Sequence, residues 1–170
     1  QARIDRSGAS LQCRAHRLEQ LARKLAIAVI EFDHGARQEG LDVQPSHQES
    51  FIASTRMNRT WEEVLLSVDG IVVSGGNTLN QQAIWKAQGI DAVLRTAWDR
   101  GIVLGGASAG SLCWFDEGTT DSRPKVLTVV KCLGFIPGSH SPHYDAEPGR
   151  RPLYQRLIAS GEMKPGYACD

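Results

Sequence analysis

The sequence lacks a strong net charge and long apolar runs, two features that would point directly to a class of partner. Its 19 basic residues balance 19 acidic ones, so no strong field favours nucleic acid or an anionic membrane. No apolar run approaches the roughly 20 residues of a membrane-spanning helix, and the longest, residues 25–30, is short for a signal-peptide core. We therefore expect a soluble cytoplasmic protein that binds neither nucleic acid nor membranes.

Cysteine is also scarce, and its spacing argues against a metal site. The four cysteines are Cys13, Cys113, Cys132 and Cys169. They form no C-x-x-C pair, and a zinc site needs paired ligands of that kind. Cys113 and Cys132 lie in apolar surroundings and are expected to be buried free thiols. Cys113 is an alternative nucleophile because it follows Ser108 by five residues, but it has no tight turn of its own.

From about residue 60 onward, strand and helix signals alternate along the chain. The expected elements are helix 61–66 with a capping box of Thr60 and Glu63, strand 71–73, helix 79–88 capped by Asn77 and Thr78, helix 91–100, and a fully buried strand 102–104. Gly89 and Gly101 are expected to end the two longer helices. The alternation predicts one α/β domain over residues 1–170, with a mostly parallel sheet between two layers of helices.

The first fifty residues are harder to interpret. Apolar residues at helical spacing between residues 11 and 25 predict a basic helix. We expect this helix to pack on the domain, with a membrane surface or a presequence as the alternatives. Residues 25–32 are typical of a strand and residues 33–50 of a loop. The three histidines of this region, His16, His34 and His47, are expected to lie on the surface.

The most informative motif is Gly106-Ala-Ser-Ala-Gly110, which fits G-x-S-x-G. In a strand–turn–helix setting this pattern forms a nucleophile elbow, whose sharp turn requires small neighbours around the serine. The predicted strand before it and the apolar segment after it supply that setting. The alternative interpretation is an ordinary glycine-rich loop. We favour the elbow and expect Ser108 to be a nucleophile with backbone N–H groups close by.

A serine nucleophile needs a base and an acidic group that orients the base. After Ser108 the polar segments 119–122 and 139–145 are both expected to be loops, and they contain Asp121, His140, His143 and Asp145. A metal site formed by His140, His143 and Asp145 is the competing interpretation. It lacks the helical spacing common in such sites, so we favour a base.

Several blocks of the chain resemble one family of serine peptidases. They are Gly75-Gly-Asn-Thr78, Gly106-Ala-Ser-Ala-Gly-Ser-Leu-Cys-Trp-Phe115, Thr119-Thr-Asp121 and Ser141-Pro-His-Tyr144, with further likeness at residues 83–90 and 147–152. Over residues 51–170 the sequence resembles the peptidase E (alpha-aspartyl dipeptidase) branch of the family that also contains cyanophycinase. The resemblance implies an α/β fold like that of class I glutamine amidotransferases, with serine at the elbow.

The resemblance also implies a role for individual residues. Ser108 matches the nucleophile, His143 the general base and Asp121 the orienting acid. The oxyanion would be held by N–H groups of Gly75 or Gly76 and of Ala109. Asn77 and Thr78 match substrate-binding positions. One of Arg150, Arg151 and Arg156, with Arg151 our first choice, is expected to pair with a substrate aspartate.

These assignments predict a serine exopeptidase without metal or organic cofactor, acting on dipeptides with amino-terminal aspartate. A short peptide is the expected partner, and a homodimer is left open. One alternative is a cyanophycinase-like or other peptidase of the same family, and another is a catalytically silent, amidotransferase-like binding domain. Residues 1–50 diverge from the family pattern, and the family continues beyond the position of Asp170. We therefore expect either a fragment or a divergent amino terminus.

Overall fold

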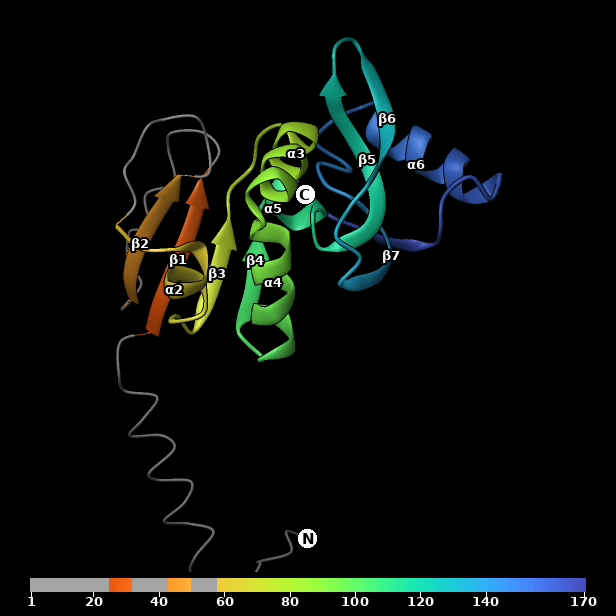
Figure 1. The fold of residues 1–170 in the computed structure, drawn as a ribbon. Coiled ribbons are helices and arrows are strands. Elements are labelled where there is room, and N and C mark those ends of the chain that lie inside the picture. Colours follow the sequence, from red (N-terminus) through yellow and green to blue (C-terminus); the bar gives the residue numbers. More distant parts are fainter. Residues whose placement is uncertain (1–24, 32–42, 50–57) are drawn as a thin grey trace, which may run out of the picture.

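The computed structural model describes residues 25–31, 43–49 and 58–170, and it arranges them as strands alternating with short helices (Figure 1). The elements are β1 (Leu25–Glu31), β2 (Val43–Glu49), α2 (Trp61–Leu65), β3 (Gly70–Val73), α3 (Thr78–Gln88), α4 (Ile90–Asp99), β4 (Val103–Gly106), α5 (Ala109–Leu112), β5 (Phe115–Arg123), β6 (Val126–Lys131), β7 (Ile136–Ser141), α6 (Arg150–Ala159) and β8 (Gly166–Ala168). None of the described helices is long and apolar enough to span a membrane.

The strands form two sheets of four strands each. The first sheet has the order β2-β1-β3-β4, and all its neighbours are parallel. The second has the order β6-β5-β7-β8, in which only the β5–β6 pair is antiparallel. The chain is thus an α/β protein with largely parallel sheets, as the sequence predicts, although its described strands are divided between two sheets.

Local signals in the sequence set several of the helix ends. Thr60 and Glu63 form the predicted capping box at the start of α2. The Asn77 side chain accepts a hydrogen bond from the N–H of Asn80 and so caps α3. Gly89 ends α3 with φ 73°, a left-handed conformation that glycine adopts without strain. These predictions are confirmed because each depends on contacts within a few residues.

Two expectations about the first sheet are wrong. Part of segment 33–50 is not a loop, because residues 43–49 form β2, which pairs with β1 along its whole length. This strand is polar and contains Pro45, a residue that edge strands tolerate. Strand 102–104 was expected to be buried, but β4 also lies at an edge of its sheet, and Val103 is 71% exposed. The predicted helix 11–25 lies outside the described residues except for Leu25, which is the first residue of β1. Cys13, His16 and His34 also lie outside them, and His47 lies on β2.

The polar segments after the elbow also differ from expectation. Residues 119–122 belong to β5, and residues 139–141 belong to β7. They are strands because their polar side chains find partners inside the protein. The hydroxyl groups of Thr119 and Ser141, for example, lie 2.7 Å apart between the strands. Buried polar groups that bond in this way cost little free energy.

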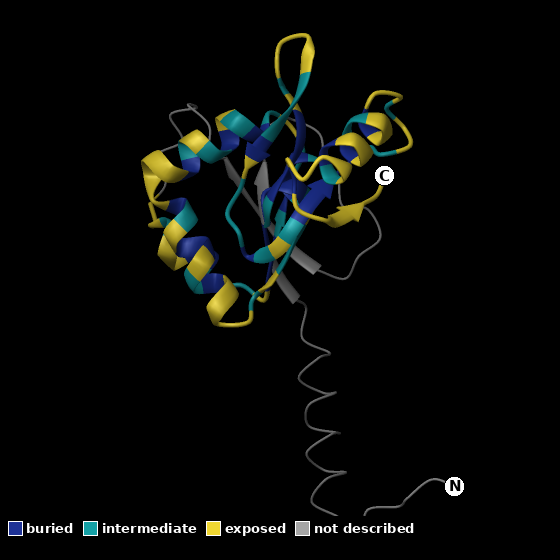
Figure 2. Cartoon of the chain, turned by 90° about the vertical axis from the view of Figure 1, so that its right-hand side faces the viewer, coloured by how far each residue is buried: buried dark blue, intermediate teal, exposed yellow. Residues whose placement is uncertain are grey.

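The main hydrophobic core lies between the first sheet and helices α2, α3 and α4. It contains Leu65, Ile71, Trp85 and Leu94, all fully enclosed. Figure 2 shows their helices buried on the inner side and exposed on the outer side. Trp98 departs from the expected buried face of α4, since it is 39% exposed and packs beside Phe135.

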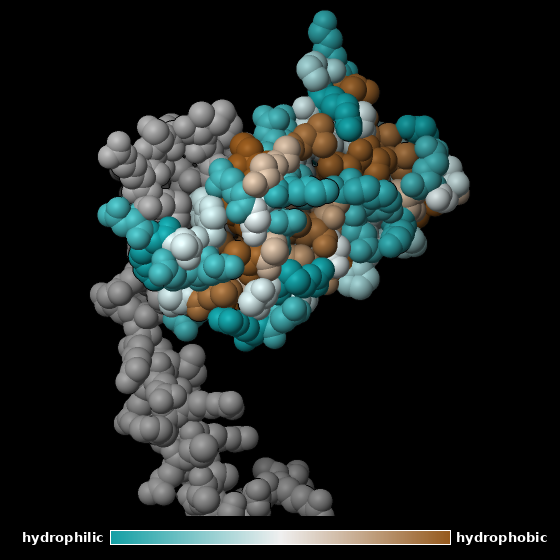
Figure 3. Space-filling model, viewed as in Figure 1, coloured by the Kyte–Doolittle hydropathy of each residue, from teal (hydrophilic) through white to brown (hydrophobic). Residues whose placement is uncertain are grey.

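The β5–β6 hairpin projects away from the rest of the molecule (Figures 1 and 2). Its tip is exposed, and Lys125 there has φ 63°, as a tight turn requires. Apolar residues gather where the hairpin joins the body (Figure 3). Thr119 and Asp121 lie on β5 between this base and the exposed tip.

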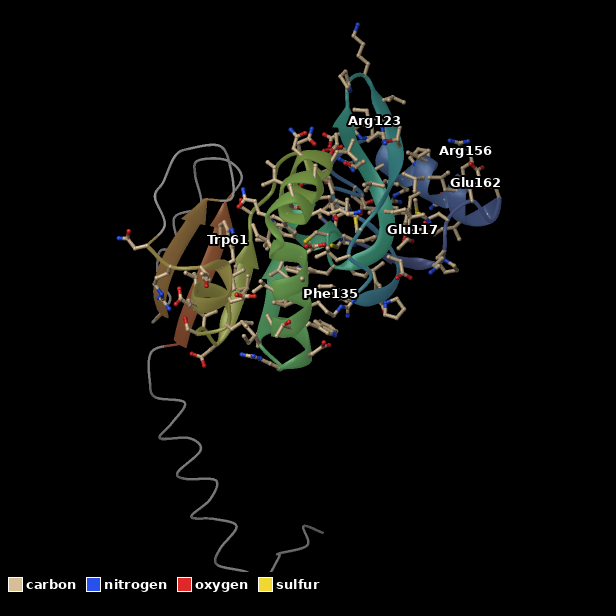
Figure 4. The ribbon with its side chains drawn as sticks, viewed as in Figure 1. Trp61, Glu117, Arg123, Phe135, Arg156 and Glu162 are labelled. Carbon is tan, nitrogen blue, oxygen red and sulfur yellow. The ribbon has the colours of Figure 1, made fainter. Side chains whose placement is uncertain are left out.

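Two acidic residues at the base of β5 anchor the segment that leads into β8. Asp116 accepts hydrogen bonds from Lys164 Nζ at 2.7 Å and from the N–H of Gly138 at 2.9 Å. Glu117, buried and labelled in Figure 4, bonds to Lys131 and to the N–H of Lys164. The Lys164 hydrogen bond lowers the pKa of Asp116. Burial alone would raise the pKa of Glu117, but its bonds to Lys131 and to the Lys164 N–H lower it overall.

This anchor predicts a loss of stability in acid. Carboxyl groups with a lowered pKa in the folded state stabilise it above their unfolded pKa, and that contribution disappears as pH falls through the folded value. The free energy of unfolding is therefore expected to fall as pH drops below about 4.5. Urea titrations at several pH values should show a smaller decline in the double variant Asp116→Asn/Glu117→Gln. Equal declines in the two proteins would contradict the prediction.

Candidate active site

Ser108 lies at the tight turn between β4 and α5. Its backbone has φ 54° and ψ −118°, a conformation that residues other than glycine rarely adopt. Such strain costs about 1–3 kcal/mol and persists mainly where the surroundings enforce it at functional sites. The turn is held by a hydrogen bond from the Ala107 N–H to the carbonyl of Val73 and by bonds from Ser111 and Leu112 to the carbonyl of Ser108.

Close backbone packing explains the small residues of the motif. A Cβ atom on Gly110 would lie 2.0 Å from the carbonyl oxygen of Val73, and one on Gly106 would lie 2.4 Å from the carbonyl oxygen of Gly110. These neighbours are backbone atoms of β3 and α5, which cannot move aside as a flexible side chain can. The glycines therefore allow the elbow to sit directly against the end of β3.

Gly110→Ala is accordingly expected to destabilise the protein by about 1–3 kcal/mol, the usual cost of overpacking, or more. Gly105→Ala is the matched control, because a Cβ atom there would meet nothing within 4 Å. Urea unfolding of both variants measures the difference. Equal stability of the two variants would contradict the packing argument.

His143 follows β7, and its ring reaches the elbow. Its Nε2 atom lies 2.8 Å from Oγ of Ser108, which is hydrogen-bonding distance. The backbone of His143 also has φ 54°, so both members of this pair sit in strained conformations. The two residues come from different sheets, and the fold alone brings them together across 35 positions of sequence.

Backbone of the start of α5 and of loop 75–76 lies next to the serine. Ala109 is the first residue of α5, and its N–H donates to no described residue. Gly75 lies directly against Ser108, since a Cβ atom on it would come within 3.1 Å of the serine Cβ. Gly76 follows with φ 133°. Loop 75–76 and the start of α5 therefore face the same hydroxyl group.

The next two residues of this loop make contacts with β5. The Asn77 side chain donates to the carbonyl of Ser122 at 3.0 Å while capping α3. Thr78 is buried and lies 3.4 Å from the hydroxyl of Thr120. Both side chains are thus engaged by β5 and hold the loop in place.

Asp121 does not bond to His143 in this structure. Its side chain is 67% exposed and lies 3.5 Å from Nη2 of Arg150. Among the described residues, no carboxylate bonds to Nδ1 of His143. The expected direct contact between the orienting acid and the base is therefore not formed, because the Asp121 carboxylate faces the Arg150 guanidinium instead.

Arg150 is buried, which its sequence context did not indicate. Its guanidinium donates to Glu147 Oε2 at 2.7 Å and to the carbonyl of Thr119 at 2.9 Å. The N–H of Glu147 in turn donates to the carbonyl of His143 at 3.0 Å. Arg150 thus connects the turn that carries His143 with β5. Arg150 differs from Arg151 and Arg156 because its own side chain is enclosed, and two of its partners, Thr119 and Asp121, lie far from it in sequence.

Arg151, the first choice for a substrate contact, lies on the surface beside the His143 turn. It is 54% exposed, forms an ion pair with Asp145 and stacks over the ring of Tyr144 at 5.0 Å. Asp145 is thus engaged with arginine. In the described part of the chain, no three His, Cys, Asp or Glu side chains are grouped so as to hold a metal ion.

His140 and Cys113 lie close to the elbow but are enclosed. The His140 ring stacks on Phe115 at 4.7 Å, and its Nδ1 donates to the carbonyl of Tyr167 at 3.1 Å. Burial lowers the pKa of His140 and raises the pKa of Cys113. A buried neutral thiol is a weak nucleophile. Cys132 is only partly buried, contrary to expectation, but desolvation by the surrounding protein still raises the pKa of its thiol to about 12.

Comparison with known proteins identifies the family. The sequence profile of peptidase family S51 matches residues 32–170. An uncharacterised peptidase of Bacillus subtilis (strain 168), YgaJ, is 45% identical over 130 residues. This match covers 76% of the present chain and 55% of that relative, so the chain spans little more than half the relative's length.

The fold is also similar to a solved structure. A candidate peptidase E protein from Listeria monocytogenes EGD-e superposes with a TM-score of 0.57 at 17% identity. The match covers 80% of this chain and 74% of that one. At this identity the likeness concerns the fold. The profile match over residues 32–170 shows that the chain belongs to peptidase family S51, the peptidase E family.

Proposed function

We propose that the protein is a serine exopeptidase that hydrolyses short peptides through Ser108 and His143. The distance of 2.8 Å between Ser108 Oγ and His143 Nε2, at the turn of a strained elbow, carries this proposal. A hydroxyl at such a distance can pass its proton to the imidazole as it attacks. Membership of a peptidase family supports a peptide as the substrate.

The reaction follows from the positions of these groups. Ser108 Oγ attacks the carbonyl carbon of the scissile peptide while His143 Nε2 takes its proton. His143 then returns the proton to the leaving amine, and the carbon–nitrogen bond breaks. Water, deprotonated by the same nitrogen, hydrolyses the resulting ester and frees Ser108.

The tetrahedral intermediate carries a negative charge on oxygen, which needs donors. The N–H of Ala109 and the N–H of Gly75 or Gly76 are our candidates, since they flank the serine and the Ala109 N–H has no partner among the described residues. Loss of one such donor typically costs about 3–4 kcal/mol in transition-state stabilisation. The backbone of Asn77 and Thr78 continues this loop and is our proposed contact for the substrate.

We propose that Asp121 supports His143 indirectly. Its carboxylate pairs with Arg150, and Arg150 bonds to Glu147 beside the His143 turn. Asp121→Asn should therefore lower the rate less than His143→Ala does. If the two variants lose activity equally, Asp121 acts directly on His143 during turnover.

The substrate class we favour is a dipeptide with amino-terminal aspartate. Arg151 is an exposed guanidinium that contacts Asp145 and Tyr144 in the His143 turn, and a substrate carboxylate would replace Asp145 as its partner. Arg151→Met is expected to lower kcat/KM for Asp-X at least about tenfold, or about 1.4 kcal/mol. Cleavage of Ala-X should change little.

Arg156→Met is the matched control for this prediction. Arg156 is also exposed on α6 but lies towards its far end, as Figure 4 shows. Dipeptide hydrolysis by the parent and both variants should separate specificity from general damage. Equal losses on Asp-X and Ala-X would make Arg151 a structural residue.

A catalytically silent binding domain is the remaining alternative. Reaction with a fluorophosphonate probe tests the enzyme directly, because the probe labels only a serine that an adjacent base activates. We expect one label, on Ser108. A folded parent protein that is not labelled and cleaves no dipeptide would favour the silent domain.

A further inference from the structure

The turn that carries His143 is held by residues far along the chain. Four successive N–H groups follow His143 in the sequence, and each has a defined acceptor. The N–H of Tyr144 donates to the carbonyl of Cys169 at 3.2 Å. The N–H groups of Asp145 and Ala146 both donate to Oδ1 of Asp170 at 3.0 Å. Three of the four therefore end on Cys169 and Asp170, and the fourth returns to the His143 carbonyl.

The position of Cys169 and Asp170 is itself set by the second sheet. β8 pairs in parallel with β7, and Ala168 lies opposite Ser141. The N–H of Cys169 donates to the carbonyl of Ser141 at 3.2 Å and so extends this pairing by one residue. Residues 169 and 170 consequently lie beside the turn at the point where β7 ends and His143 begins to leave the sheet.

A strained base needs such support. With φ 54°, the His143 backbone is less stable than an ordinary turn, so it is retained only while neighbouring contacts enforce it. A carboxylate that accepts two backbone N–H groups forms stronger hydrogen bonds than a neutral acceptor does. Asp170 is the only described side chain that accepts from N–H groups of residues 144–147.

We propose that Cys169 and Asp170 form a clasp that positions His143 for its reaction with Ser108, with Asp170 as the positioning residue. The proposal rests on the proposed function, in which His143 is the base. Asp170 does not touch the reacting atoms. It acts by keeping the turn closed, so that Nε2 of His143 stays within reach of the serine hydroxyl.

The test compares two replacements of Asp170 in the full chain. Asp170→Ala removes the acceptor, and we expect the rate of fluorophosphonate labelling at Ser108 and kcat for dipeptide hydrolysis to fall about 10- to 100-fold, with KM little changed. Asp170→Asn keeps an Oδ1 atom in place and should retain most of the labelling rate. Asp99→Ala, an exposed acid at the end of α4, is the control for a simple loss of charge.

Amide hydrogen exchange provides a second readout that does not depend on activity. In Asp170→Ala the amides of Asp145 and Ala146 should exchange faster than in the parent, whereas those of the β5–β6 pair should be unchanged. If Asp170→Ala does not fold, Asp170→Asn and Asp170→Ser carry the comparison, since a serine hydroxyl supplies a shorter acceptor.

The outcomes separate the clasp from the proposed function. Unchanged labelling and unchanged exchange in Asp170→Ala would overturn the clasp while the parent remains an enzyme. Equal losses in Asp170→Asn and Asp170→Ala would also overturn it, because the Oδ1 acceptor that asparagine keeps would then make no difference to the turn. A parent protein that is neither labelled nor active would overturn the proposed function, and the role of the clasp in catalysis would fail with it. Slow amide exchange at Asp145 and Ala146 would then show only that the two hydrogen bonds to Asp170 exist.

Discussion

Ser108→Ala is expected to abolish peptide hydrolysis, with a loss of about four to six orders of magnitude in kcat, as for nucleophiles in comparable serine enzymes. The substitution removes one oxygen atom and nothing that the fold needs. Ser108 precedes α5, but its side chain makes no capping hydrogen bond. Alanine and serine also bear the strained backbone at this turn about equally, so the unfolding midpoint should change little.

The measurement combines dipeptide hydrolysis, fluorophosphonate labelling and thermal unfolding of the purified variant. Ser160→Ala is the control, because Ser160 is an exposed serine that ends α6. Its activity should equal that of the parent. Hydrolysis retained by Ser108→Ala would show that another group attacks the substrate and would remove the basis of the proposed function.

His143→Ala is expected to lower activity almost as far as Ser108→Ala, since a nucleophile and its base act as a unit. The side chain is only partly buried, and Ser108 Oγ is its one recorded hydrogen-bond partner among the described residues. Stability should therefore be nearly unchanged. Labelling by the fluorophosphonate probe should become slow in the same variant, because the serine loses its proton acceptor.

His140→Ala should give the opposite pattern. His140 is buried, stacks on Phe115 and bonds to Ser111 and to the carbonyl of Tyr167. Its loss leaves a cavity and unpaired polar atoms, with an expected cost of about 2–4 kcal/mol. Activity per folded molecule should remain well above that of His143→Ala. A greater loss of activity in folded His140→Ala than in His143→Ala would reverse the assignment of the base.

The sequence by itself determined those features that depend on neighbouring residues. The capping box of α2, the Asn77 cap of α3 and the glycine that ends α3 each depend on contacts between residues a few positions apart. The elbow is also readable, because a sharp strand–turn–helix bend tolerates only small residues around its serine. The family blocks extend this reading over most of the chain.

Tertiary structure decided the features that depend on distant partners. The polar strand β2 is specified by its pairing with β1 more than by its own residues. Val103 is exposed because of the place of β4 in the sheet order. The position of β4 leaves no signal in its local sequence, since an apolar edge strand and a central strand can have similar composition, whereas Pro45 in β2 is compatible with an edge.

The same division holds at the candidate site. Residue types and spacing alone single out Ser108 and favour His143, because a nucleophile requires a base further along the chain. Which of the charged residues reaches which partner was decided by folding. Arg150 forms ion pairs with Asp121 and Glu147. The Asp170 carboxylate accepts hydrogen bonds from two N–H groups of the turn after His143. These contacts join residues that are 3 to 29 positions apart. They form because sheet pairing and burial bring the residues together, so the order of charges along the sequence does not predict which of them will pair.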